Sequence, residues 1–136
     1  MLGAHVTLVA PPTLLPPSLD GWPVDVAHGI DEVIDDIDVL YLLRMQRERM
    51  SEALVPSLRE YSACFGLTSA RARRLSEHAL VMHPGPMNRG VEMAVDPSEL
   101  PGSVITQQVT NGVAVRMAVL FHLLGSGASL AGEVAP

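Results

Sequence analysis

The sequence predicts an α/β protein in three layers, with an open parallel sheet, helices on both faces and a long C-terminal helix. Three observations favour this fold class. Short β-branched runs alternate with segments of helical periodicity. The run 38–43 is almost entirely apolar, which is typical of a strand buried on both faces of a parallel sheet. The last apolar stretch, 103–124, predicts a long helix that Gly112 interrupts.

The first third of the chain predicts two strands and two helices. The β-branched run 2–10 predicts a strand that the prolines after it end, and 23–27 predicts a second, short strand. Between them, 13–19 predicts a short helix, followed by a turn at 20–21. Isoleucine and valine then recur at intervals of three and four residues over 29–37, which predicts a helix with one apolar face.

The middle of the chain continues the alternation. The strand predicted at 38–43 is followed by a helix over 51–65, with apolar side chains at helical spacing. Thr68 is predicted to cap a second, basic helix. The apolar run 79–82 predicts the next strand, and the prolines within 91–102 predict an irregular segment. Right-handed crossovers then bring the carboxyl ends of the parallel strands to one side of the sheet.

Composition excludes several classes of function. The 136 residues are enough for one domain, and fifteen acidic against nine basic side chains give a net charge of −6, which argues against nucleic-acid binding. A single cysteine, Cys64, excludes an internal disulfide framework and a cysteine-based metal cluster, and it fits a reducing cytoplasm. We expect no metal, because the histidines have no partners at ligand spacing, and no membrane contact, because no apolar run reaches about 20 residues.

Two strand ends carry the candidate chemistry, and the first is the end of the strand 38–43. Arg44 stands where this strand meets water, and a guanidinium there can hold a carboxylate through two parallel hydrogen bonds. Gln46 points to the same side if the extended geometry continues, so it can add an amide contact. The charged residues at 47–49 are interpreted as a solvated loop.

The second strand end opens a stiff loop, His-Pro-Gly-Pro-Met-Asn-Arg-Gly at 83–90. Pro84 and Pro86 each remove a backbone donor, Gly85 allows close approach to the backbone, and one of the X-Pro bonds can be cis. An open α/β sheet binds its ligand at such a place. The alternatives are a proline-rich surface turn and, for His83, a buried histidine that hydrogen-bonds a neighbouring backbone.

The remaining candidates favour structural roles. Cys64 has apolar helical neighbours and is expected to pack rather than to react. The methionines are more typical of a core than of a binding stripe: Met82, Met87, Met93 and Met117. Three arginines of the basic helix are expected to form one solvated face: Arg71, Arg73 and Arg74. No GxGxxG or P-loop motif is present, which places a generic nucleotide-cofactor binder last among the alternatives.

Three stretches resemble the second half of the aspartate carbamoyltransferases. They are YLLRMQRERM at 41–50, MHPGPMNRGVEM at 82–93 and QQVTNGVAVRMAVL at 107–120, and the similarity in order and spacing extends over 2–124. The resemblance implies a Rossmann-like fold and transfer of a carbamoyl group from carbamoyl phosphate to L-aspartate, in pyrimidine synthesis, without cofactor or metal. The ornithine enzymes remain the alternative, but their cysteine in the 83–86 loop and their Ser-Met-Gly segment are missing here.

The resemblance also implies roles for single residues. Arg44 matches an arginine that binds an aspartate carboxylate, and Gln46 matches a glutamine that positions aspartate. The carbonyls of Pro84 and Gly85 match acceptors for the carbamoyl NH2 group. Gly85 and Pro86 match the pair that binds carbamoyl phosphate through a cis peptide bond. No residue of this chain is matched to a catalytic acid, base or nucleophile.

The resemblance covers only about half of the family's length. It implies an aspartate-binding domain at 1–124 and a flexible tail at 125–136, without the N-terminal domain that binds carbamoyl phosphate. The last helix of the family crosses back to that domain, and the enzymes are homo-oligomers, trimers in this family, of the cytoplasm. We therefore expect the chain to be inactive by itself, and a non-catalytic interaction module remains a further alternative.

Overall fold

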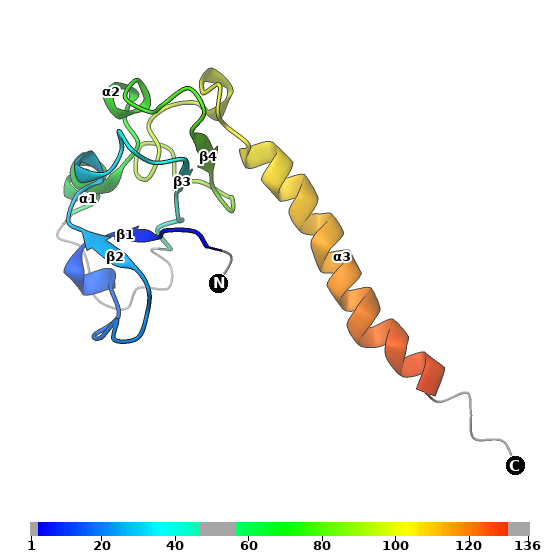
Figure 1. The fold of residues 1–136 in the computed structure, drawn as a ribbon. Coiled ribbons are helices and arrows are strands. Elements are labelled where there is room, and N and C mark those ends of the chain that lie inside the picture. Colours follow the sequence, from blue (N-terminus) through cyan, green and yellow to red (C-terminus); the bar gives the residue numbers. More distant parts are fainter. Residues whose placement is uncertain (1–2, 47–56, 131–136) are drawn as a thin grey trace, which may run out of the picture.

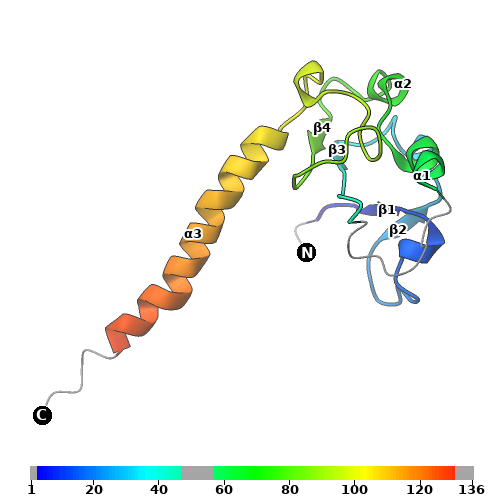
Figure 2. The ribbon, with the colours of Figure 1, turned by 180° about the vertical axis from the view of Figure 1, so that it is seen from behind.

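The computed structural model describes residues 3–46 and 57–130, and it has a small α/β body from which one long helix projects (Figure 1). That helix, α3, spans Ile105–Leu130. Helices α1, Leu58–Phe65, and α2, Ser69–Ala72, lie on one side of the strands, and α3 starts on the other (Figures 1 and 2). The predicted α/β class and long C-terminal helix are confirmed.

The described residues contain four strands, which form two parallel pairs. Strand β1, Thr7–Val9, pairs with β2, Asp25–Ala27, and β3, Val39–Tyr41, pairs with β4, Leu80–Met82. All four lie inside the predicted runs but are shorter than predicted. In β3 and β4 the register sets Leu40 opposite Val81. The parallel direction, which the alternation of strands and helices predicts, is confirmed in both pairs.

The helices of the first third are reduced to single turns. The predicted helices 13–19 and 29–37 contain only the 3-10 turns Pro12–Leu14 and Ile30–Glu32. Prolines at 16 and 17 limit the first segment, because a proline inside a helix removes a backbone hydrogen bond. The second segment still buries Ile30 and Ile34. The apolar spacing therefore predicted the buried positions correctly, although the helix is shorter than predicted.

Side-chain caps fix where α1 and α2 begin. The hydroxyl of Ser57 accepts from the backbone N–H of Glu60, and that of Thr68 accepts from the N–H of Arg71. Each cap satisfies a donor that the first turn of a helix leaves unpaired. The cap predicted at Thr68 is confirmed. The predicted start of the preceding helix, at 51–52, lies outside the described residues.

The core lies between β4 and the segments that return to it after the 83–90 loop. Val81 of β4, Leu67 and Met93 are almost completely buried. Leu67 and Met93 form an isolated parallel bridge, and Val81 forms another with Ser103. The segment 91–102 is therefore irregular, as predicted, but its backbone is anchored to the core. Gly102 approaches β4 so closely that a Cβ there would lie 2.0 Å from the carbonyl oxygen of Ala79.

Strand β3 corrects one prediction. The apolar run 38–43 predicted burial on both faces, but Val39, Tyr41 and Leu43 are 48%, 49% and 67% exposed. Leu42, on the opposite face, is 6% exposed. A strand alternates its side chains between two faces, and here only one face packs on the core. The apolar run thus marks a strand whose second face is uncovered in this chain.

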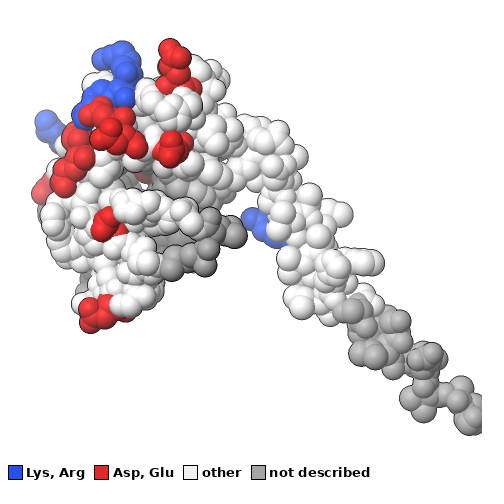
Figure 3. Space-filling model, viewed as in Figure 1, with Lys and Arg blue, Asp and Glu red and all other residues white. Residues whose placement is uncertain are grey.

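Helix α3 also differs from its prediction. It is continuous through Gly112 and extends past the predicted end at Leu124 to Leu130, inside the segment 125–136 predicted as a flexible tail. Ile105 at its start is buried in the core, but the apolar side chains farther along are exposed, with Phe121 at 74% and Leu124 at 73%. Figure 3 shows its visible described surface as nearly free of charged side chains. No helix in the described part of the chain is long and apolar enough to cross a membrane.

Candidate functional site

The two predicted site segments lie side by side where β3 and β4 end. The backbone N–H of Leu42 donates to the carbonyl oxygen of Met82 at 2.9 Å, which continues the ladder to the last residue of β4. Arg44 follows two residues after Leu42, and the loop that contains Pro84, Gly85 and Pro86 follows Met82. The parallel pairing therefore brings both predicted halves of the site to one edge of the sheet, because the carboxyl ends of parallel strands lie together.

The 83–86 loop is held from inside by its histidine. His83 is fully buried, and its Nδ1 accepts from the backbone N–H of Gly85 at 2.9 Å. The bond Gly85–Pro86 is cis, which confirms the prediction, and Gly85 has a φ of +64°, a conformation that favours glycine. Pro84 and Pro86 are exposed. The alternative in which His83 is a buried histidine that hydrogen-bonds a neighbouring backbone is confirmed. The two prolines of the loop face solvent.

Arg44 and Gln46 flank a backbone that the neighbouring loop holds in place. Both side chains are half-buried, and Met45 between them is 5% exposed. The carbonyl of Met45 accepts from Asn88 Nδ2 at 3.0 Å, and its N–H faces a carboxylate oxygen of Glu92 at 3.4 Å. The charged residues at 47–49, interpreted above as a solvated loop, lie outside the described residues.

Glu92 is a buried carboxylate that the sequence reasoning missed. It is 1% exposed, and its Oε1 accepts from the backbone N–H of Asn88 at 3.2 Å and from Asn88 Nδ2 at 3.1 Å. The same oxygen lies 3.4 Å from Nε2 of His83. The sequence signal that could have identified Glu92 as buried is its place between two apolar residues, Val91 and Met93, in a segment that is otherwise irregular.

Gln108 is a second residue that the sequence reasoning missed, and it ties α3 to the site. Its side-chain oxygen accepts from the backbone N–H of His83 at 3.0 Å, and its Nε2 donates to the hydroxyl of Tyr41 at 2.9 Å. One amide thus joins the first turns of α3 to the end of β3 and to the start of the loop. The only indication of Gln108 in the sequence was its place in the stretch 107–120.

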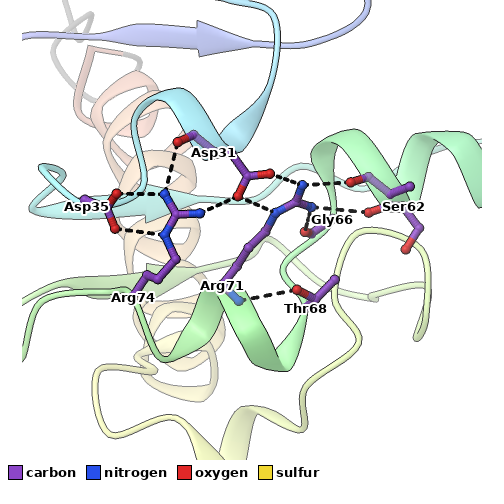
Figure 4. A network of polar contacts seen from close by, with 8 residues as sticks. Asp31, Asp35, Ser62, Gly66, Thr68, Arg71 and Arg74 are labelled. Carbon is purple, nitrogen blue, oxygen red and sulfur yellow. Dashed lines mark hydrogen bonds and ion pairs between the residues drawn. The ribbon is translucent and has the colours of Figure 1, made fainter.

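The basic helix is not one solvated face, because Arg71 is buried, whereas Arg73 and Arg74 are exposed as predicted and Arg74 is also ion-paired. Arg71 is 8% exposed, and it donates to both carboxylate oxygens of Asp31 and, at 2.7 Å, to the carbonyl of Gly66 (Figure 4). Arg74 pairs with Asp31 and, at 2.7 Å, with Asp35.

The arginines shift the ionisation of the two aspartates. The hydrogen bond from Arg71, with the charges of Arg71 and Arg74, holds the pKa of Asp31 below its ordinary value. The hydrogen bond and charge of Arg74 lower the pKa of Asp35 in the same way. This network joins α1, α2 and the turn 30–32, so its role is architectural.

Two further predictions, for Cys64 and for the methionines, have mixed outcomes. Cys64 is exposed on α1, so the prediction that it packs is wrong. Met93 is buried and Met87 packs against the core as predicted, but Met117 is 65% exposed because it lies on the projecting part of α3. Within the described ranges, no group of three or more His, Cys, Asp or Glu side chains is placed to hold a metal ion.

Comparison with known proteins gives a consistent result. The model of the family described as aspartate/ornithine carbamoyltransferase, Asp/Orn binding domain, matches residues 1–123. The aspartate carbamoyltransferase catalytic subunit of Acidothermus cellulolyticus is 56% identical over 135 residues, which cover 98% of this chain and 42% of that protein. That of Thermobifida fusca is 56% identical over 124 residues, 91% of this chain and 40% of that protein.

Solved structures give the same picture. Aspartate transcarbamoylase from Trypanosoma cruzi in complex with carbamoyl aspartate and phosphate superposes with a TM-score of 0.69 at 32% identity, over 86% of this chain and 40% of that one. The same enzyme in complex with N-(phosphonacetyl)-L-aspartic acid superposes with a TM-score of 0.60 at 33% identity, over 72% of this chain and 30% of that one. The chain thus spans less than half the length of the relatives it matches.

Proposed function

Because the chain belongs to the aspartate/ornithine carbamoyltransferase family through its Asp/Orn-binding domain, we propose that it supplies the aspartate-binding half of an aspartate carbamoyltransferase. The reaction moves the carbamoyl group of carbamoyl phosphate to the amino group of L-aspartate, giving N-carbamoyl-L-aspartate and phosphate, in de novo pyrimidine synthesis. The names of the relatives and the ligands in the related structures support this assignment over the ornithine reaction.

One observation carries the proposal: the end of β3, with Arg44, and the cis loop after β4 lie at the same edge of the sheet. Arg44 binds an aspartate carboxylate through paired hydrogen bonds, and Gln46 helps to orient the amino acid. The carbonyls of Pro84 and Gly85 accept from the carbamoyl NH2 group, and Gly85 and Pro86 bind carbamoyl phosphate. These residues contribute binding and orientation, which place the amine within reach of the carbonyl carbon.

The phosphate end of the substrate is assigned to a domain outside this sequence. Residues 1–124 form the aspartate domain, α3 extends beyond it to Leu130, and an N-terminal carbamoyl-phosphate domain completes the site. The chain by itself is accordingly inactive, and the complete enzyme is a cytoplasmic homo-oligomer, a trimer as in the family. It uses neither a cofactor nor a metal, because acyl transfer to an amine needs only bound anions and a polarised carbonyl.

The exposed face of α3 fits this assignment. Along the helix, large apolar side chains lie open to solvent, including Val113, Phe121 and Leu124. A helix that exposes so much apolar surface is typical of a segment that packs against another domain. We assign the missing half as the partner, since the last helix of the family crosses back to it.

The test is carbamoylaspartate formation by the chain alone and by the chain co-expressed with an N-terminal carbamoyl-phosphate domain. Turnover is expected only in the mixture, with L-aspartate but not with L-ornithine. Arg44→Ala should abolish it, whereas Arg73→Ala, which removes an exposed arginine of α2's end, should leave it unchanged.

The other outcomes separate the alternatives. Turnover by the chain alone would show that the phosphate site is misassigned. Turnover with ornithine would favour the ornithine reaction. No turnover from a mixture that demonstrably assembles would favour a non-catalytic interaction module built from this half of the enzyme.

A further inference from the structure

The two halves of the proposed site are joined through one buried carboxylate. Glu92 lies after the cis loop in sequence, yet its Oε1 faces the backbone N–H of Met45, the residue between Arg44 and Gln46. Asn88 closes the same connection, because its Nδ2 donates both to Glu92 Oε1 and to the carbonyl of Met45. The backbone on which both predicted aspartate ligands stand is therefore held from the loop side by a single carboxylate–amide pair.

His83 extends this connection to the carbamoyl-phosphate side. Its Nδ1 accepts from the N–H of Gly85, so we assign the ring proton to Nε2, the nitrogen that lies 3.4 Å from Glu92 Oε1. Gly85 is one of the predicted carbamoyl-phosphate residues. A path of contacts thus runs from Gly85 through the imidazole and the Glu92 carboxylate to the backbone of Met45.

Burial of these groups argues against a purely structural role. His83 and Glu92 are 0% and 1% exposed; within the described residues Glu92 Oε2 has no hydrogen-bond partner, and His83 Nε2 has only its 3.4 Å contact with Glu92 Oε1. An incompletely paired carboxylate in a protein interior is costly, and an apolar side chain of similar size fills such a space at lower cost. A carboxylate in this place is useful because it gathers several N–H donors at one point.

We propose that Glu92, together with His83, is a positioning residue that sets the distance between the aspartate-binding strand end and the carbamoyl-phosphate loop; this inference rests on the proposed function. The hydrogen-bond acceptor at Oε1 performs this role, rather than the charge. Glu92 touches neither substrate and acts through Met45 and Gly85. The effect is expected on aspartate affinity, because removing the acceptor leaves buried N–H donors unpaired, and these donors hold the backbone that carries Arg44 and Gln46.

The experiment is an L-aspartate titration of the full 136-residue chain, followed by amide chemical shifts, with L-ornithine as the control ligand. Four proteins are compared: the unmodified chain, Glu92→Leu, Glu92→Gln and Asp31→Asn. Glu92→Leu should weaken aspartate binding about tenfold or more. Glu92→Gln should restore affinity to within about threefold of the unmodified chain, because its amide oxygen can accept the same N–H groups. Asp31→Asn disturbs the remote arginine network and should leave affinity unchanged.

A spectroscopic signature separates positioning from general damage. The imidazole nitrogen spectrum should show the Nε2–H tautomer of His83 in the unmodified chain, and Glu92→Leu should shift the amides of Met45 and Gly85 together. If Glu92→Leu loses the dispersed amide spectrum of a folded protein, Asn88→Ala carries the test, because Asn88 is half-exposed and bridges the same two segments. It should weaken aspartate binding in the same direction.

Each outcome is decisive. An unmodified chain that shows no aspartate-dependent shifts overturns this inference, whereas the proposed function is decided separately by turnover in the co-expressed mixture. If the unmodified chain binds aspartate and Glu92→Leu, or Asn88→Ala in its place, binds equally well, the proposed function stands and the inference fails. Loss of binding in Glu92→Gln as large as in Glu92→Leu would overturn the assignment to the acceptor oxygen and point to the charge.

Discussion

At the scale of single residues, buried polar groups decide more of this structure than its apolar positions suggest. Arg71 donates at 2.7 Å to the carbonyls of Ala63 and Gly66, at the end of α1, while it pairs with Asp31. One guanidinium thereby supplies donors to carbonyls that the last turn of a helix leaves unpaired. It also fixes the turn 30–32 against α1 and α2, so its loss affects three segments.

Replacing Arg71 by alanine should lower the free energy of unfolding by about 2–3 kcal/mol, because buried carbonyls lose their donors. Asp31 is half-exposed and can be solvated again, so it adds little to this loss. Arg73→Ala is the matched control and should change stability by less than about 0.5 kcal/mol. Urea unfolding of both variants measures the difference; equal values for the two would refute the buried role of Arg71.

The aspartates of the chain predict an acid-sensitive fold. The pKa of Asp31 and of Asp35 is lowered by the arginines, and that of Asp96 is lowered to about 2, chiefly by the backbone N–H and hydroxyl of Ser98 and then by Arg89. A depressed pKa in the folded state stabilises the protein above the ordinary carboxyl value, and this stability is lost as the pH falls through the folded value.

The urea midpoint should therefore be constant from neutral pH down to about 5, and should fall between about pH 4 and pH 2. In Asp31→Asn the neutral-pH midpoint should be lower and the acid decline shallower, since one of the contributing carboxylates is gone. An Asp31→Asn variant that declines as steeply as the unmodified chain would contradict the assignment of Asp31 to this effect.

At the scale of elements, glycines act in opposite ways at two positions. In α3, a Cβ at Gly112 would meet only the flexible end of Arg116, at 3.9 Å, and the helix is continuous there. At Gly102, by contrast, a Cβ would overlap the backbone of Ala79 next to β4. Gly112 thus lowers the helix propensity of α3, whereas Gly102 is needed because a side chain there would clash with the neighbouring backbone.

The pair Gly112→Ala and Gly102→Ala should change stability in opposite directions. Gly112→Ala should stabilise α3 by about 1 kcal/mol, the difference in helix propensity, and raise the helical signal in circular dichroism. Gly102→Ala should destabilise the body by about 1–3 kcal/mol, because the backbone beside β4 must move. Thermal unfolding of both variants decides the matter; a tolerated Gly102→Ala would mean that the segment 100–104 is free to shift.

At the scale of the whole molecule, the chain exposes apolar surface on two features. One face of β3 carries exposed Val39, Tyr41 and Leu43, and α3 carries a longer series of exposed apolar side chains. In Figure 3 the charged side chains lie mostly over the body, and α3 has few of them. An exposed apolar surface of this extent favours self-association over a dispersed monomer.

Sedimentation velocity should show concentration-dependent association of the isolated chain. The double variant Phe121→Lys, Leu124→Lys should reduce association, because it places charges on the apolar face of α3. Thr106→Lys, Asn111→Lys adds the same charge at exposed polar positions of the same helix and should have little effect. A sharp monomer boundary for the unmodified chain at all concentrations would refute this prediction.

The sequence by itself determined the features that depend on neighbours along the chain. Apolar runs located the described strands and α3, and Thr68 marked the start of α2. For the loop at 83–86, the family resemblance implied the cis bond, and the residues left a buried His83 as one of two alternatives. Parallel pairing of β3 and β4 then placed Arg44 beside the loop, because the carboxyl ends of parallel strands lie at the same edge of a sheet.

Only the tertiary structure decided what depends on residues far apart in the chain. Asp31 and Arg71 are 40 positions apart, Met45 and Glu92 are 47 apart, and no local periodicity relates them. The exposure of β3 and α3 is likewise set by which other segments cover them, not by their own composition. Local patterns fix the secondary structure and the strand ends, whereas pairing and burial are set by the packing of the whole chain.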